Sequence, residues 1–322
     1  MRILVNVARA AIAISMLGYL FSRIDLAEAF ARAVNGDLVF IVSGTLVLAF
    51  QPLIGAIRWL VVLASNRSAV PLPLALRWTY IGVFFGQVLP ATVGADALRI
   101  WYATRRALSL KNAVTSVMLD RVAMMLTLIL LLCFGGTFLR RYVDGSMLTL
   151  ALLAILGGGV AGLSAVIFGD RLPIRLYRFR LVRGIGHLAR DAKSLLNSPR
   201  SALIVFGMCL LSYLTLMTSI YLFARGFGAE SRFLDIIVLL PPVLAASMLP
   251  ISIGGWGTRE LAMVAALGTA GIAPETALLA SLWLGLGSIV IALPGAFFFL
   301  TDRGSPGSIA AAAASVQQQS GA

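Results

Sequence analysis

Four stretches of this 322-residue sequence are apolar, contain no charged residue and are at least 20 residues long. They are Leu38–Ile57, Met147–Phe168, Ala202–Ala224 and Thr276–Thr301. A helix of ~20 residues is long enough to cross the ~30 Å hydrocarbon core of a bilayer, and apolar runs of this length are typical of membrane spans. Because four such runs occur in one chain, the sequence predicts an all-α polytopic membrane protein.

The overall composition agrees with this class. Hydrophobic residues make up 60% of the chain and charged residues 12%, against ~25% charged residues in ordinary soluble domains. The 26 Lys and Arg exceed the 13 Asp and Glu, which gives a net charge of +13. In a soluble chain this excess would suggest nucleic acid as a partner. Here the basic residues lie in loops, where they orient the chain and contact lipid headgroups, so we expect no nucleic-acid partner.

Two further segments bring the expected crossings to six, at about 3–22, 38–58, 112–136, 147–169, 201–224 and 276–301. The N-terminal segment, with its apolar run Ala10–Phe21, also resembles a secretory signal peptide. We favour a first membrane helix, because nothing after it resembles a secreted domain.

The loop charges orient these crossings. Between Arg171 and Arg200 the loop 170–200 carries eight Lys or Arg and only one acid, Asp191, so it is expected in the cytoplasm. Counting back along the chain places 137–146 outside and 99–111 inside. Both termini are then cytoplasmic, and the segment at about 72–107 must begin and end on the cytoplasmic side.

Two segments of the sequence resemble each other at an offset of 160 positions, namely "VLPATVGADALR" at 88–99 and "MLPISIGGWGTR" at 248–259. Each contains a Pro and Gly break. The loop charges make them the centres of two re-entrant helical hairpins, one at about 72–107 from the cytoplasm and one at about 236–273 from the exterior. Such a pair forms an inverted repeat; the alternative is that two Pro and Gly breaks agree by chance. We therefore expect a single integral membrane domain over 1–303 and a disordered cytoplasmic tail over 304–322.

Several charged residues fall inside these apolar or hairpin segments, where each costs ~3 kcal/mol on insertion scales unless it has a partner. They are Asp96, Arg99, Asp120, Arg121, Arg259 and Glu260. One interpretation is structural: each acid pairs with the base close to it in sequence. The other is functional: Arg99 and Arg259 meet and bind an anionic headgroup.

The functional interpretation is supported by the half-helix that follows each break, because its first N–H groups attract anions. An arginine can bind phosphate through two parallel hydrogen bonds. Glycines without side chains allow a headgroup to approach the backbone. The candidate substrate-binding residues are therefore Arg99, Arg259, Asp96, Glu260, Asp120, Arg121, Gly94, Gly254, Gly255 and Gly257.

The segments "GQVLPATVGADALR", "LDR" at 119–121 and "LPISIGGWGTRE" resemble the lysylphosphatidylglycerol synthase transmembrane family. This flippase-like integral membrane domain occurs alone or fused to an aminoacyl-lipid synthase. The resemblance covers about residues 5–300 and implies an inner-membrane protein associated with lipid translocation, with the same charged and glycine residues in its site. Ala95 departs from the family pattern, where a second glycine is expected. Residues 304–322 do not resemble a soluble catalytic domain, so we do not expect aminoacyl transfer.

We expect a flippase or translocator of the bacterial inner membrane that moves a phospholipid, an aminoacyl-lipid or another lipid-linked anionic headgroup between leaflets. The alternatives are an accessory membrane subunit of a lipid or glycolipid biosynthesis pathway, and an intramembrane enzyme acting on lipid phosphates. The sequence contains no Walker A motif, no metal-binding cluster and one histidine, His187. We therefore expect no enzymatic activity, cofactor or metal. The expected partners are anionic membrane lipids and a separately encoded lipid synthase.

Overall fold

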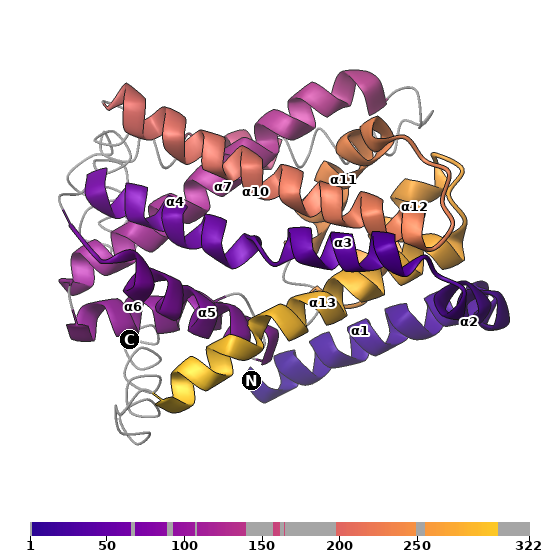
Figure 1. Cartoon of the computed structure of the whole chain (residues 1–322), viewed down its shortest axis with the longest axis horizontal. Coiled ribbons are helices and arrows are strands. Elements are labelled where there is room, and N and C mark those ends of the chain that lie inside the picture. Colours follow the sequence, from indigo (N-terminus) through magenta and orange to yellow (C-terminus); the bar gives the residue numbers. More distant parts are fainter. Residues whose placement is uncertain are drawn as a thin grey trace.

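The structure, a computed structural model, describes residues 2–65, 68–88, 93–106, 108–139, 157–161, 164, 198–248 and 255–301. Within these residues all regular secondary structure is helical (Figure 1), which confirms the all-α prediction. The helices are α1 Arg2–Arg23, α2 Leu26–Val34, α3 Leu38–Leu48, α4 Gln51–Ser65, α5 Leu72–Val88, α6 Val93–Arg106, α7 Leu110–Leu139, α10 Pro199–Gly226, α11 Phe233–Ser247, α12 Thr258–Gly268 and α13 Pro274–Thr301.

Four helical segments among the described residues are long and apolar enough to cross a membrane. They are Leu38–Ser65, which joins α3 and α4, Leu110–Gly136 in α7, and the whole of α10 and α13. They coincide with the predicted crossings at 38–58, 112–136, 201–224 and 276–301. The predicted crossing at 3–22 falls on α1, which is helical but is not one of the four. The predicted crossing at 147–169, the loop that follows it and the C-terminal tail lie largely outside the described residues, so a total of six crossings stays a prediction.

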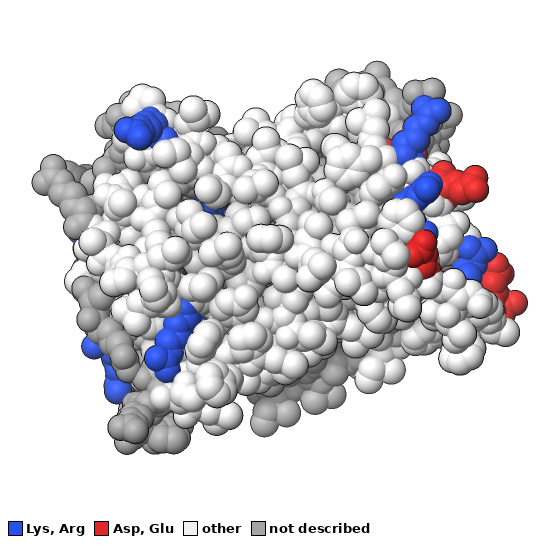
Figure 2. Space-filling view, viewed as in Figure 1, with Lys and Arg blue, Asp and Glu red and all other residues white. Residues whose placement is uncertain are grey.

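Charged residues gather at the two ends of the molecule, and the face between them is almost entirely uncharged (Figure 2). At one end, where α4 and α6 finish and α5, α7 and α10 begin, the described residues include Arg77, Arg105, Lys111 and Arg200 (Figure 1). We call this the basic end. The opposite end is mixed in charge, and its described acids are Asp25, Glu28, Asp37, Glu230, Asp235 and Glu275. The remaining described acids, Asp96, Asp120 and Glu260, are buried.

Two pairs of short helices, α5 with α6 and α11 with α12, pack side by side within each pair. The first pair begins and finishes at the basic end, and the second begins and finishes at the mixed end (Figure 1). These helices are 17, 14, 15 and 11 residues long, shorter than the ~20 residues of a full crossing. Their positions match the predicted hairpins at 72–107 and 236–273. That they are re-entrant in a bilayer and related as an inverted repeat stays a prediction, because residues 89–92 and 249–254 of the breaks lie outside the described residues.

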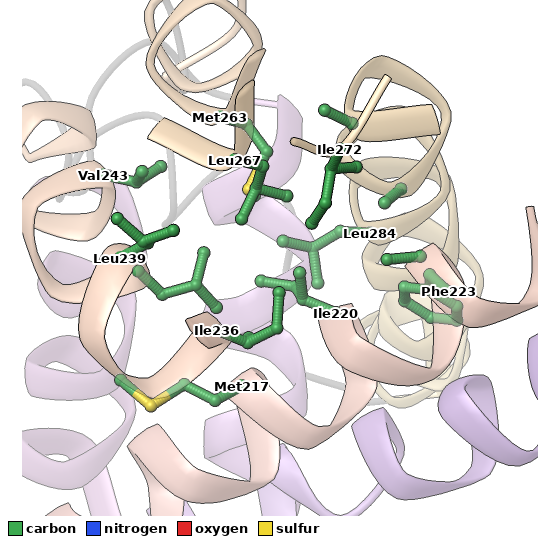
Figure 3. Close-up of a cluster of buried hydrophobic side chains, with 14 of the residues drawn as sticks. Met217, Ile220, Phe223, Ile236, Leu239, Val243, Met263, Leu267, Ile272 and Leu284 are labelled. Atoms are coloured by element: carbon green, nitrogen blue, oxygen red, sulfur yellow. The ribbon is translucent and has the colours of Figure 1, made fainter. Parts of the chain in front are cut away.

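Each helix pair has its own apolar core. The second pair packs against α10 and α13 through side chains from all four helices (Figure 3), including Met217, Ile220, Ile236, Leu239, Met263, Leu267 and Leu284. The first pair packs against α4 and α7 through Trp59, Trp78, Ile81, Tyr102 and Val117. Helices α4, α6 and α7 are therefore held in fixed rotation about their axes, which positions the polar side chains that they carry.

Candidate functional site

Five charged residues from three helices lie together inside the molecule. They are Arg58 from α4, Asp96 and Arg99 from α6, and Asp120 and Arg121 from α7. All are buried except Arg121, whose side chain is 44% exposed. Four of the five were predicted from the sequence. Arg58 was not.

Each aspartate of this cluster binds an arginine from another helix. Asp120 accepts hydrogen bonds from Arg58 at 2.5 Å (Nε to Oδ1) and 3.2 Å (Nη2 to Oδ2). Asp96 accepts two from Arg121, at 2.8 Å (Nε to Oδ2) and 3.0 Å (Nη2 to Oδ1). Both pairs are therefore bidentate, the strong geometry of an arginine with a carboxylate.

This pairing differs from the one predicted between residues close in sequence. Asp120 and Arg121 are consecutive on α7, but each binds a residue of another helix, Asp120 with Arg58 and Arg121 with Asp96. Asp96 and Arg99 do lie on one face of α6, but the distance from Arg99 Nη1 to Asp96 Oδ1 is 4.0 Å. The carboxylates are instead reached by arginines on neighbouring helices.

Arg99 remains without a close partner in this cluster. Its Nη1 lies 3.6 Å from Asp120 Oδ2, and its Nε and Nη2 have no hydrogen-bond partner among the described residues. The residue is only 8% exposed, and its guanidinium lies over the ring of Trp59, 4.5 Å from the centroid. Trp59 is in turn fixed by a 3.1 Å hydrogen bond from its Nε1 to Ser116 Oγ. A buried donor without a partner costs ~1–3 kcal/mol, and more when it is charged.

Four of the five charged residues, all but Asp96, line a cavity of about 300 Å³. Neutral polar groups on its wall come from Gln51, Thr79, Gln87, Ser212, Tyr213 and Ser288, and apolar groups from Leu48, Pro52, Val83, Met124, Leu216 and Ile291. The hydroxyl of Thr79 is buried and, like Arg99, has no hydrogen-bond partner among the described residues. The cavity therefore combines an apolar wall with two unsatisfied polar groups.

The cavity lies about halfway along the long helices α10 and α13. Ser212 and Ser288 lie at the middle of α10 and α13, which are 28 residues long each. A 28-residue helix is ~42 Å long, so both serines are ~20 Å from either helix end.

A second buried cluster surrounds Glu260 at the start of α12. Its Oε1 accepts hydrogen bonds from Arg259 Nη2 at 2.6 Å, Arg259 Nε at 3.1 Å and Ser281 Oγ at 3.1 Å. Its Oε2 accepts the backbone N–H of Gly257 at 2.6 Å, where φ is 86° and glycine is favoured. The anion at this helix start is therefore the protein's own Glu260 carboxylate.

The sequence profile of one protein family, described as the lysylphosphatidylglycerol synthase TM region, matches residues 6–295. The chain belongs to this family. The match confirms the resemblance of its motifs and indicates an integral membrane protein related to lipid modification or translocation. A search of curated protein sequences finds no match to the chain.

In this member of the lysylphosphatidylglycerol synthase TM family, the predicted site residues fall into two groups. Asp96, Arg99, Asp120 and Arg121 belong to the first cluster. Gly257, Arg259 and Glu260 belong to the second, and Gly255 lies in the turn before it with a φ of 80°. Arg259 is not among the residues that line the cavity of Arg99. Gly94 is in the first turn of α6, and Gly254 lies outside the described residues.

Arg58, Trp59, Thr79 and Ser212 also belong to the site, and sequence reasoning missed them. Arg58 ends the uncharged run Leu38–Ile57, but apolar residues continue after it to Ala64. That continuation was the available signal, because it places the arginine inside a span. Nothing local distinguishes Thr79 or Ser212 from other small polar residues in membrane helices.

Proposed function

We propose that this protein moves a lipid with an anionic headgroup between the leaflets of the bacterial inner membrane. The observation that carries the proposal is Arg99, a buried arginine with two unpartnered N–H groups on the wall of a cavity at mid-depth. A guanidinium binds phosphate through two parallel hydrogen bonds. A headgroup phosphate bound there would satisfy donors that the protein itself leaves unsatisfied.

The mixed lining of the cavity suits a lipid. The phosphate accepts hydrogen bonds from Arg99 and Thr79, and the glycerol and first methylenes contact the apolar wall. Ligand cavities commonly combine an apolar wall with a few placed polar groups. Many transporters with inverted repeats bind their substrate near the membrane midplane. Here the cavity is lined by α5 and α6 of the first pair together with α3, α4, α7, α10 and α13, and α11 and α12 contribute none of its described lining residues.

The charge distribution supports an orientation. Basic residues without acidic neighbours are typical of the cytoplasmic side, so the basic end faces the cytoplasm in this proposal. The first hairpin then enters from the cytoplasm and the second from the exterior. Both termini are cytoplasmic.

The alternative of an intramembrane enzyme has less support. Asp96 and Asp120 are each bound by two hydrogen bonds from an arginine, and Glu260 accepts hydrogen bonds on both oxygens. Carboxylates held in this way are poor proton acceptors. We therefore propose translocation without enzymatic chemistry. The geometry offers no specific support for an accessory subunit.

The test is lipid translocation in liposomes containing the purified protein. A fluorescent phospholipid is followed by quenching of its outer-leaflet fraction. We expect Arg99→Gln to slow translocation at least about tenfold, because one charge-assisted hydrogen bond contributes about 1.5–3 kcal/mol. The matched control is Arg105→Gln, an exposed arginine on the same helix that stacks on Trp101. It should translocate like the wild type.

Two results would contradict the proposal. If liposomes with the wild-type protein move lipid no faster than protein-free liposomes, the proposed translocation function is wrong. If Arg99→Gln keeps the wild-type rate, the proposed phosphate site at Arg99 is wrong.

A further inference from the structure

The charged residues of the cavity cluster do not balance. Arg58, Arg99 and Arg121 contribute three positive charges, and Asp96 and Asp120 contribute two negative ones, which leaves +1. Residues 89–92 and 249–254 of the two breaks contain no charged side chain in the sequence, so they do not alter this sum. The cluster of described residues therefore carries a net charge of +1, part of it on the half-exposed Arg121, and Arg99 is its arginine without a bidentate carboxylate partner.

The free hydrogen-bonding groups of Arg99 also have a definite shape. Nε and Nη2 lie along one edge of a guanidinium and donate in parallel. In the same cluster Arg58 and Arg121 use this edge, Nε with Nη2, to bind the two oxygens of a carboxylate. The corresponding edge of Arg99 has no partner among the described residues. It matches one oxyanion with two equivalent oxygens, as in a phosphodiester.

Starting from the proposed lipid translocation, we propose that the cavity selects a small monoanionic phosphodiester headgroup with no cationic group. A monoanion brings the net charge of the cluster to zero. A phosphate monoester with two negative charges leaves an uncompensated negative charge. A headgroup with ammonium groups adds positive charge beside three arginines, and uncompensated buried charge is costly in each case.

This selectivity excludes the lipid after which the family is named. Lysylphosphatidylglycerol carries one phosphodiester and two ammonium groups, so its headgroup is net positive. A free carboxylate would stabilise an ammonium group most strongly, and an aromatic face, which on this wall only Tyr213 supplies among the described residues, would do so more weakly. Both aspartates of the cluster are bound to arginines, and Arg99 covers the face of Trp59. No described residue of the cavity wall offers a carboxylate that is free of an arginine.

The size of the cavity limits the headgroup as well. About 300 Å³ is the lower end of the ~300–1,000 Å³ range of ligand pockets. It suits a phosphate with a short uncharged group, such as glycerol, and not an oligosaccharide. Thr79 supplies a neutral hydroxyl for this group or for a phosphate oxygen, without adding charge.

The experiment compares four fluorescent lipids with identical acyl chains in liposomes containing the full-length protein. Their headgroups are phosphoglycerol, a phosphate monoester, phosphoethanolamine and lysyl-phosphoglycerol. We expect phosphoglycerol to move fastest, at least about tenfold faster than the lysyl ester. A rate for the lysyl ester equal to or above that of phosphoglycerol would overturn the selectivity while leaving translocation intact. If none of the four moves faster than in protein-free liposomes, translocation itself is wrong.

A variant of Asp96 tests whether the net charge of the cluster sets the headgroup preference, because the readout is a ratio of two translocation rates and not either rate alone. Asp96→Asn raises the net charge of the cluster from +1 to +2, so the ratio of phosphate monoester to phosphoglycerol rates should rise several-fold. A structural role for Asp96 would lower both rates and leave their ratio unchanged, which would contradict the charge sum. The melting temperature of the variant shows whether it is folded.

A further arm separates a lipid from a soluble source of the same phosphodiester. Radiolabelled glycerophosphoglycerol has the headgroup chemistry without acyl chains, and we expect no protein-dependent uptake of it into the liposomes. Uptake comparable to that of the lipid would identify a soluble substrate and overturn the lipid assignment.

Discussion

At the scale of residues, the site depends on which arginine each aspartate binds. Arg58 holds Asp120 and Arg121 holds Asp96, and this leaves the guanidinium edge of Arg99 without a partner. Asp120 is nevertheless close to Arg99, with 3.6 Å between Oδ2 and Nη1. In the proposed site Arg58 would therefore act as a positioning residue, because it keeps Asp120 from taking the place of a ligand.

This role predicts an indirect effect of Arg58. In Arg58→Gln, Asp120 loses its strongest partner and binds Arg99 instead, so translocation should fall at least about tenfold. The double variant Arg58→Gln with Asp120→Asn keeps the net charge of the cluster at +1 and removes the competing carboxylate, so the rate should recover. Liposome translocation and melting temperature are measured together. A folded double variant as slow as Arg58→Gln would exclude this role.

The two arginines of the repeated motif should also differ in their contribution to stability. Arg259 is paired with the fully buried Glu260, and removing one member of a buried pair costs about 3–5 kcal/mol. Arg99 is not the main partner of either aspartate. We expect Arg259→Gln to lower the melting temperature in detergent clearly more than Arg99→Gln does. Equal losses would show that Arg99 is a structural ion-pair partner.

At the scale of elements, the cavity wall depends on the close approach of α13 to α5. A Cβ on Gly295 would overlap the carbonyl oxygen of Tyr80. One turn further along, Phe298 packs edge-on against Tyr80 at 6.0 Å between ring centroids, and its carbonyl accepts a 3.0 Å hydrogen bond from Arg77. These contacts hold α13 and α5 together where Ser288 and Ile291 of α13 and Thr79 and Val83 of α5 line the same cavity.

Gly295→Ala should therefore separate α5 from α13 and cost about 1–3 kcal/mol, the usual cost of overpacking. The melting temperature and the translocation rate should both fall. Gly207→Ala in α10 is the matched control, because a Cβ there has no neighbour within 4 Å. It should be neutral or slightly stabilising, by up to about 1 kcal/mol. Equal melting temperatures for the two variants would disprove the close contact.

At the scale of the whole molecule, charge separates the two ends. The basic end carries arginines and lysine, whereas the mixed end carries six of the nine described acids (Figure 2). Positive charge favours the cytoplasmic side. The uncharged surface between the ends is the part that contacts lipid.

This orientation predicts which sites react from outside the cell. Single cysteines replace Ser198 at the basic end and the exposed Glu230 at the mixed end, in a background of Cys133→Ala and Cys209→Ala. Glu230 is used because the neighbouring Ala229 is buried. A membrane-impermeant maleimide should label Glu230→Cys in intact cells and Ser198→Cys only after permeabilisation. The reverse labelling pattern would show that the basic end faces the exterior.

The sequence by itself determined the class of the protein, the positions of four helices long and apolar enough to span a membrane, and both pairs of short helices. The length of an apolar run and the positions of Pro and Gly breaks are local properties of the chain. They do not depend on how the helices pack. It also indicated four of the five charged residues of the cavity cluster, since a charge in an apolar segment is conspicuous. The predicted crossing at 147–169 and the break residues lie outside the described residues, so those predictions stay open to experiment.

Only the tertiary structure decided which charges pair. Spacing along the chain suggested Asp96 with Arg99, Asp120 with Arg121 and Arg259 with Glu260. The last pair does form, at 2.6 Å, whereas Arg58 and Arg121 approach the other two carboxylates from neighbouring helices. The apolar cores around Trp59 and Leu239 set the rotation of those helices, and no local pattern contains that information. The same packing separated Arg259 from the cavity and left Arg99 with an edge that has no hydrogen-bond partner among the described residues. Partner choice in a buried ion cluster is a property of helix packing, because it depends on where several distant segments place their side chains at once.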